Sequence, residues 1–177
     1  HRQRRRTGQD AGMSEAPTSK APALLTGRIE FLAAAKRLVS DTRYNASLLT
    51  QVLDPRVFGD ASFADAVKEF LLLQRNARLR VLVAQPQLAV RGPHALVELG
   101  RLLASRVEFR EFAPDKPTPR EELLLGDGRL LLERNSADAL ESRLIRDDPL
   151  IARERQRRFD ALWDHAVPSI ELRRQSL

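Results

Sequence analysis

A nearly symmetrical run in the middle of the chain, Leu-Leu-Leu-Gly-Asp-Gly-Arg-Leu-Leu-Leu at residues 123–132, restricts the fold more than any other feature. Each leucine triplet is typical of the centre of a buried strand. The Asp127-Gly128 pair between them favours a tight hairpin turn, because glycine accepts the positive φ that such a turn needs. The run therefore predicts a β-hairpin that belongs to a larger buried sheet.

Three more segments have the composition of strands. Residues 79–84 form a β-branched run that ends at a Gln-Pro turn, and they are the clearest central strand. Residues 107–110 alternate between apolar and polar side chains, as a half-buried strand does. Residues 44–52 alternate less regularly, but their apolar end indicates a buried strand before the turn at Asp54-Pro55.

The first two predicted helices begin at recognisable capping residues. Residues 28–39 have apolar side chains at helical spacing, and Thr26 is the expected N-cap. Residues 63–74 form the second helix, with Ser62 as N-cap and Asp65 at the position of a capping box.

Two further helices lie in the second half of the chain. One starts at Gly92-Pro93, because proline suits the first turn of a helix. The other covers residues 149–167, with Asp147 or Asp148 as its N-cap. The tail after Pro168 is expected to run extended across the sheet.

The order of these elements, α-β-α-β-α-β-β-β-α, predicts the α/β class. We expect a three-layer sandwich in which a mixed, largely parallel central sheet is flanked by helices. The parallel strands lie in the middle and the hairpin lies at one side. Residues 27–177 then form a single domain, which is long enough to bury one core.

Residues 1–26 have no apolar periodicity and are expected to be a disordered or tag-like basic leader. Residues 1–12 contain four arginines and one aspartate, so they supply +3 of the net charge of +6. The sole methionine, Met13, follows directly, which leaves open whether residues 1–12 are native. Nucleic-acid binding inferred from the overall charge would depend mostly on this segment and is not favoured.

The composition excludes several classes of protein. No run of about 18 apolar residues is present, so neither a membrane-spanning helix nor a membrane partner is expected. The chain has no cysteine, which excludes disulfides and thiolate metal sites and is typical of a cytoplasmic protein. Its three histidines are scattered, so no metal site and no cofactor are predicted.

Residues 120–128 read Arg-Glu-Glu-Leu-Leu-Leu-Gly-Asp-Gly. This segment resembles the His-x-Lys-x-x-x-x-Asp motif of the phospholipase D superfamily. With Asp127 in the Asp position, Arg120 takes the His position and Glu122 takes the Lys position.

Weaker similarities extend over most of the chain. They lie at Leu53-Asp54-Pro55, Phe58, Val81-Leu82-Val83, Gly92-Pro93-His94, Val107-Glu108-Phe109-Arg110, Phe159 and Trp163. Together they resemble an uncharacterised bacterial phospholipase D-like family that is often linked to GNAT-type acetyltransferases. The resemblance implies a phospholipase D-like half-domain with a degenerate motif.

The replacements in the motif remove the chemistry that the resemblance implies. Phospholipase D-type enzymes use a histidine nucleophile, a second histidine that protonates the leaving group, and lysines that hold the phosphate oxygens. Arg120 cannot act as a nucleophile, and Glu122 would repel a phosphate. Residues 134–137, Arg-Asn-Ser-Ala, stand where the superfamily has Gly-Ser-x-Asn. Hydrolysis by this route is therefore not expected, and no catalytic residue is assigned.

Arg120, Arg134 and His94 are the candidates for holding an anion near the degenerate motif. His94 lies near a helix N-terminus, which favours anions, but a capping or packing histidine is the favoured interpretation. Asp127 is interpreted mainly as a turn residue. The arginines of residues 153–158 alternate with acidic side chains, which favours a solvated helix face over phosphate binding.

Three functional hypotheses are consistent with these residues. The first is a catalytically inactive phospholipase D-like domain that acts as a binding or assembly module. For this module the resemblance implies a homodimer or an acetyltransferase partner. The alternative is a nucleic-acid-binding module that uses arginine clusters, although an aromatic stacking surface is missing. The third is a phosphodiesterase with a rearranged site in which His94 takes part.

Overall fold

The computed structural model describes residues 21–173. The strands are β1 (Ala23–Thr26), β2 (Asn45–Thr50), β3 (Arg78–Val83), β4 (Val107–Glu111), β5 (Glu122–Gly126), β6 (Leu130–Arg134), β7 (Glu141–Ile145) and β8 (Val167–Pro168). The helices are α1 (Gly27–Ser40), α2 (Ala61–Leu73), the 3-10 helix η1 (Pro86–Val90), α3 (Ala95–Leu102), α4 (Pro149–Asp164) and α5 (Ile170–Arg173).

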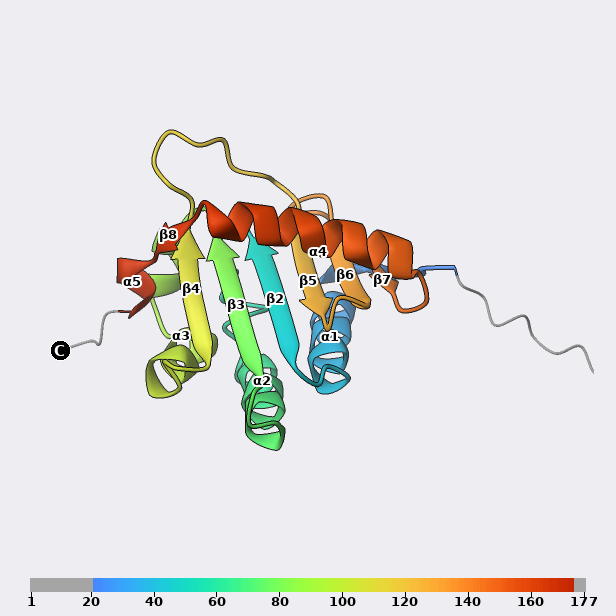
Figure 1. Cartoon of the computed structure of the whole chain (residues 1–177), viewed down its shortest axis with the longest axis horizontal. Helices are drawn as coiled ribbons and strands as arrows, with labels where there is room; N and C mark the ends of the chain where they lie inside the picture. The colour runs from blue at the N-terminus through green and yellow to red at the C-terminus, as the bar shows by residue number, and fades with distance from the viewer. Residues whose placement is uncertain (1–20, 174–177) are drawn as a thin grey trace, which may run out of the picture.

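These elements form three layers (Figure 1). An eight-stranded sheet is the middle layer, α1, α2 and α3 cover one face, and the long helix α4 crosses the other face. Within residues 21–173, no helix combines the length and the apolar character that crossing a membrane requires.

The strand order is β1-β7-β6-β5-β2-β3-β4-β8. The expected α/β fold with a mixed sheet is confirmed. The predicted placement of its strands is not: the parallel strands β2, β3 and β4 are fifth to seventh in the order, towards one edge, and the hairpin strands β6 and β5 are third and fourth, inside the sheet. The parallel share is smaller than predicted, because the other five pairings are antiparallel. Three of those five involve β1, β7 or β8, short strands that the sequence pattern did not predict.

The predicted leader extends too far into the chain. Ala23–Thr26 form β1, which pairs with β7, and Leu25 packs against the core. A four-residue strand at the edge of a sheet acquires its order from a distant partner, so no local pattern announces it. Residues 1–20 lie outside the described residues.

The predicted hairpin is confirmed, and its leucines point to alternate faces of the sheet. Leu124 joins the larger core beneath α1, α2 and α3. Leu123 and Leu125 join the smaller core beneath α4, where the rings of Phe159 and Trp163 stack with centroids 5.7 Å apart. Because β5 is apolar on both faces, it has to lie inside the sheet with helices on both sides.

The helix ends differ in detail from the predictions. Asp60 caps α2 in place of Ser62, and its carboxylate accepts the Ser62 N–H at 2.8 Å. Asp148, one of the two expected candidates, caps α4. Thr26 is the N-cap of α1, but its side chain makes no capping bond, and its N–H donates to Glu30 Oε2 at 2.6 Å.

The last predicted helix ends earlier than expected. α4 ends at Asp164, and Val167–Pro168 form β8, which pairs with β4. The tail then turns into the short helix α5, whose Leu172 is buried in the larger core, and does not continue extended.

A substitution at Gly100 tests the packing of α3 on β4. Alanine normally stabilises a helix interior by about 1 kcal/mol relative to glycine. At residue 100, however, a Cβ would overlap the ring of Phe109, which is buried on β4. Gly100→Ala is therefore expected to lower the free energy of unfolding by about 1–3 kcal/mol, as measured by urea denaturation.

Gly92→Ala is the matched control, because a Cβ at residue 92 would meet no atom within 4 Å. This control should leave the stability nearly unchanged. A gain in stability for Gly100→Ala would show that the Phe109 ring moves aside without cost.

Candidate functional site

The degenerate motif extends along the whole of β5, and Asp127 lies at the end where the hairpin turns. It has a φ of 55°, in the left-handed region. Its carboxylate accepts the backbone N–H groups of Arg43, Tyr44 and Asn45 at 2.8, 2.9 and 3.0 Å. Asp127 therefore binds the turn to the start of β2, which is a structural role.

The other end of β5 carries a buried ion pair. Glu122 and Arg134 lie directly opposite each other on β5 and β6, and they are 1% and 8% exposed. Glu122 Oε1 lies 2.7 Å from Arg134 Nε and 2.6 Å from Arg134 Nη2. The Thr50 hydroxyl donates to Glu122 Oε2 at 2.7 Å, and the Arg134 guanidinium lies 3.9 Å from the ring centroid of Phe31.

Burial raises the pKa of the Glu122 carboxyl, while the charge of Arg134 and the hydroxyl of Thr50 oppose that rise. A buried ion pair offsets its desolvation cost only through close geometry and additional hydrogen bonds. Here the contacts are close and Thr50 adds a hydrogen bond to Glu122, while Arg134 Nη2 makes its ionic contact without a hydrogen bond. The charges of the two side chains therefore neutralise each other, and neither charge faces solvent. Where the motif has a lysine, this chain therefore has Glu122, one member of an enclosed ion pair with no net charge.

Thr50 connects this ion pair to the loop that follows β2. Its hydroxyl oxygen accepts the Leu53 N–H at 3.1 Å. Leu53 has a φ of 51°, which is unfavourable for a leucine, so the loop depends on such contacts to keep its shape. The Leu53 carbonyl in turn accepts a hydrogen bond from His94 Nε2 at 3.1 Å.

His94 is 2% exposed and caps α3. Its Nδ1 accepts the Val97 N–H at 3.3 Å, so α3 begins at Ala95 and not at Gly92-Pro93. Because Nδ1 accepts and Nε2 donates, both ring nitrogens are engaged inside the protein. The capping interpretation of His94 is confirmed, and neither nitrogen is free to attack a substrate.

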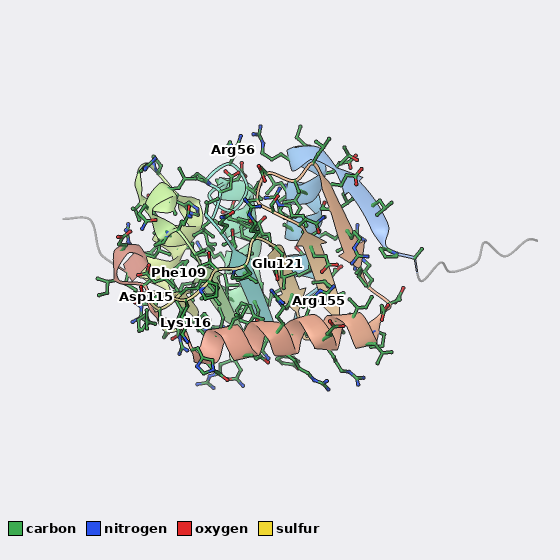
Figure 2. All side chains as sticks on the ribbon, turned by 90° about the horizontal axis from the view of Figure 1, so that it is seen from above. Arg56, Phe109, Asp115, Lys116, Glu121 and Arg155 are labelled. Carbon is green, nitrogen blue, oxygen red and sulfur yellow. The ribbon has the colours of Figure 1, made fainter. Side chains whose placement is uncertain are left out.

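A hollow of about 680 Å³ opens near the ion pair, at the carboxyl end of β2. Arg120 is exposed in this hollow. Arg56 is held by Asp54 at 3.0 Å, and although burial acts to raise the pKa of Asp54, Arg56 lowers it overall. Figure 2 shows this end of the molecule from above, with Arg56 far from α4. The lining residues are Gln51, Val52, Asp54, Pro55, Arg56, Leu88, Arg120, Ser136, Ala137 and Asp138.

A second hollow, of about 700 Å³, lies between α4 and strands β5 to β7. Its charged side chains pair with one another. Glu133 contacts both Arg143 and Arg155, and Arg158 contacts Glu121. Arg155 and Glu121 are labelled in Figure 2. Two of the arginines expected on a solvated helix face therefore take part in ion pairs that join α4 to the sheet.

The structure brings part of the predicted site together. Arg120, Glu122 and Arg134 lie at one end of the β5–β6 hairpin, and His94 reaches Glu122 only through the loop after β2. Asp127 lies at the opposite end of β5, roughly 16 Å away at the usual rise of a strand. Of the three anion-binding candidates only Arg120 faces solvent, because Arg134 and His94 are buried. The three side chains therefore do not form one anion site.

Two residues of this site were not predicted. Thr50 ends an apolar strand, and a hydroxyl at the carboxyl end of a parallel strand was the signal that could have indicated it. Asp54 was interpreted only as a turn residue. Among residues 21–173, no group of three or more His, Cys, Asp or Glu side chains could hold a metal ion.

Residues 28–175 match the model of a family described as a domain of unknown function, DUF7931. The chain belongs to this family. No curated protein matches it.

Two solved bacterial structures, one of them from a phospholipase D family member, are similar in fold to the chain. NucT from Helicobacter pylori gives a TM-score of 0.62 at 11% identity, over 84% of this chain and 99% of NucT. Nuc from Salmonella typhimurium, a phospholipase D family member, gives 0.56 at 11% identity, over 84% of this chain and 99% of Nuc. At such identities the likeness shows the fold, which is the expected phospholipase D-like α/β fold.

An archaeal DNA-binding protein is also similar in fold. TrmBL2, an archaeal chromatin protein whose structure shows a novel mode of DNA binding, gives a TM-score of 0.61 at 12% identity. The match covers 88% of this chain and 57% of TrmBL2, so the chain corresponds to little more than half of that protein.

The coupling between Glu122 and Arg134 can be measured with three variants. Glu122→Met leaves the Arg134 guanidinium buried without its counter-ion, so we expect the free energy of unfolding to fall by about 3–5 kcal/mol. The double variant Glu122→Met/Arg134→Met removes both charges and should recover most of that loss. Urea denaturation of both variants and of Arg134→Met completes the cycle. Additive losses would show that the two side chains are not coupled.

His94 predicts a loss of stability in mild acid. Burial lowers the pKa of His94 below its usual 6.5, and the Leu53 carbonyl and nearby carboxylates oppose this only in part. The folded state therefore favours the neutral ring. The contribution to stability is complete above pH 6.5 and is lost as the pH falls below that value.

The measurement is the free energy of unfolding between pH 8 and pH 5. His94→Asn is the control, because asparagine is a good N-cap that does not titrate. We expect a decline toward pH 5 in the natural chain and a flatter profile in the variant. Identical profiles would show that His94 does not titrate differently in the folded state.

Proposed function

We propose that this chain is a catalytically inactive phospholipase D-like domain that acts as a binding or assembly module. The observation that carries the proposal is the buried Glu122–Arg134 pair. Phosphoryl transfer requires exposed positive charge where the phosphate oxygens gain charge. The pair places a carboxylate at that position and neutralises it with an arginine that is itself enclosed.

The nucleophile position supports the same proposal. Arg120 is exposed in the hollow and can contact an anion, but a guanidinium has no basic atom with which to attack phosphorus. His94 is buried, and both of its ring nitrogens are engaged, which leaves a rearranged site without a nucleophile there.

The edge around Arg120 is the proposed site of assembly. By resemblance, phospholipase D half-domains pair across the edge that carries the motif. The chain covers 99% of Nuc and 99% of NucT, so it has the extent of one such unit. We propose a homodimer through this edge, and an acetyltransferase is the alternative protein partner.

A nucleic-acid-binding module is the second candidate. The likeness to TrmBL2, whose structure shows DNA binding, favours it. Arg56 and Arg120 both line the hollow at the carboxyl end of β2. Binding of this kind would weaken steeply as the salt concentration rises.

A phosphodiesterase assay on the full chain tests inactivity. With bis(p-nitrophenyl) phosphate and with plasmid DNA as substrates, we expect no turnover above that of Arg120→Ala, while a known phosphodiesterase serves as the positive control. Light scattering after size exclusion should give a dimer. Turnover that His94→Asn abolishes would contradict the proposal.

The two candidate functions separate in a titration with labelled duplex DNA. A dimer that does not bind DNA supports the assembly module. Salt-sensitive binding that is lost in Arg56→Gln/Arg120→Gln and retained in Arg4→Gln/Arg5→Gln/Arg6→Gln supports the nucleic-acid module.

A further inference from the structure

The end of the molecule opposite the hollow exposes leucines on two neighbouring helices. Here α2 and α3 end and strands β2, β3 and β4 begin, at the bottom of Figure 1. Leu72 and Leu73, at the end of α2, are 63% and 72% exposed, and Leu102, at the end of α3, is 81% exposed. Single exposed leucines are ordinary on a protein surface, whereas a cluster of them indicates a contact surface.

Arg106 connects the ends of the two helices that carry these leucines. It follows α3, and its guanidinium donates to the carbonyls of Leu71, Gln74 and Ala77 at the end of α2, at 2.5 Å for Gln74 and 2.9 Å for Ala77. Tyr44 is 51% exposed, and its backbone carbonyl accepts the Arg78 N–H at 2.9 Å, which places it beside the start of β3. We call this area the helix-end surface, made up of Tyr44, Leu72, Leu73, Arg75, Arg78 and Leu102.

The helix-end surface is positively charged as well as apolar. Residues 68–78 and 98–106, which include the last turn of each helix, contain one lysine and four arginines against Glu69 and Glu98, a net charge of +3. The nearby carboxylates of Asp41 and Asp127 are already engaged. Asp41 contacts Arg146 at 2.8 Å, and Asp127 accepts three backbone N–H groups. A net positive charge therefore surrounds the exposed leucines, although the guanidinium of Arg106 is bonded to backbone carbonyls.

We propose that the helix-end surface docks on a lipid bilayer that contains anionic headgroups. Leucines that project from helix ends can enter the boundary between headgroups and acyl chains, while arginines contact the anionic headgroups. The ring of Tyr44 suits the same depth, because it is apolar with a polar tip. This inference is independent of the proposed function, since the helix-end surface lies at the opposite end from Arg120.

Other occupants fit this surface less well. A second copy of the chain would bring Arg75 and Arg78 against the same arginines, which is unfavourable. Nucleic acid would satisfy the arginines but would leave the leucines against polar phosphates. The expectation of no membrane partner came from the lack of a spanning segment, and docking on a surface needs no such segment.

The test is sedimentation of the full chain with vesicles of phosphatidylcholine that contain one quarter phosphatidylglycerol. We expect binding to these vesicles and none to pure phosphatidylcholine. Leu72→Ser/Leu73→Ser/Leu102→Ser should lower the partition coefficient by about tenfold or more, since it removes the inserted apolar groups. Arg75→Gln/Arg78→Gln should lower it as well and should weaken its dependence on salt.

The matched control is Leu150→Ser/Arg153→Gln/Arg157→Gln on α4, where Leu150 is 75% exposed. This control should bind as the natural chain does, and thermal unfolding should show that all variants remain folded. An equal loss of binding in the control would overturn the proposal, as would the absence of binding to anionic vesicles.

Two further results would assign the binding elsewhere. Loss of vesicle binding in Arg4→Gln/Arg5→Gln/Arg6→Gln, with full binding by the leucine variant, would place it in residues 1–12 and overturn the proposal. Binding to duplex DNA that needs Arg75 and Arg78 but not the leucines would make the helix-end surface a nucleic-acid contact.

Discussion

The ion pair between Glu122 and Arg134 determines the character of one whole end of the molecule. In the motif that residues 120–127 resemble, Glu122 takes the position of a lysine. The pair joins β5 to β6 directly, reaches β2 through Thr50, and contacts α1 through Phe31. Since the loop after β2 is also held by Thr50, the same interaction positions Asp54 and shapes the hollow beside Arg120. Removing the pair would therefore disturb contacts among four elements, β5, β6, β2 and α1.

Much of the fold could be predicted from the chain alone, because its central strands are marked by composition. The leucine triplets of β5 and β6 are apolar on both faces, and only a covered sheet accommodates such strands. The missed strands β1, β7 and β8 are short and lie towards the edges of the sheet, where order comes from a partner distant in sequence. Helix ends were uncertain for a related reason: Asp60 and Ser62 are both good caps, and only the path of the preceding loop decides between them.

The site was partly visible in the sequence. The resemblance of residues 120–127 to the phospholipase D motif indicated Arg120, Glu122 and Asp127, but Arg134 was considered a residue that could hold an anion. The pairing of Arg134 with Glu122 could have been inferred from the hairpin, since residues 122 and 134 are equidistant from the turn and therefore lie opposite each other. The capping role of His94 was predicted, but its bond to Leu53 was not, because that partner is a carbonyl in a loop with an unusual backbone conformation.

The pairing of β1 with β7 has a consequence for how the chain is made. Ala23–Thr26 meet Glu141–Ile145, so two segments more than a hundred residues apart lie side by side. During synthesis the chain emerges from its N-terminus at about 5–20 residues per second. β1 is therefore synthesised several seconds before its partner β7, and that side of the sheet is completed late, when β6 and β7 have formed. In the meantime the leucines of the early strands lack part of their cover, which makes the unfinished chain a natural client for chaperones.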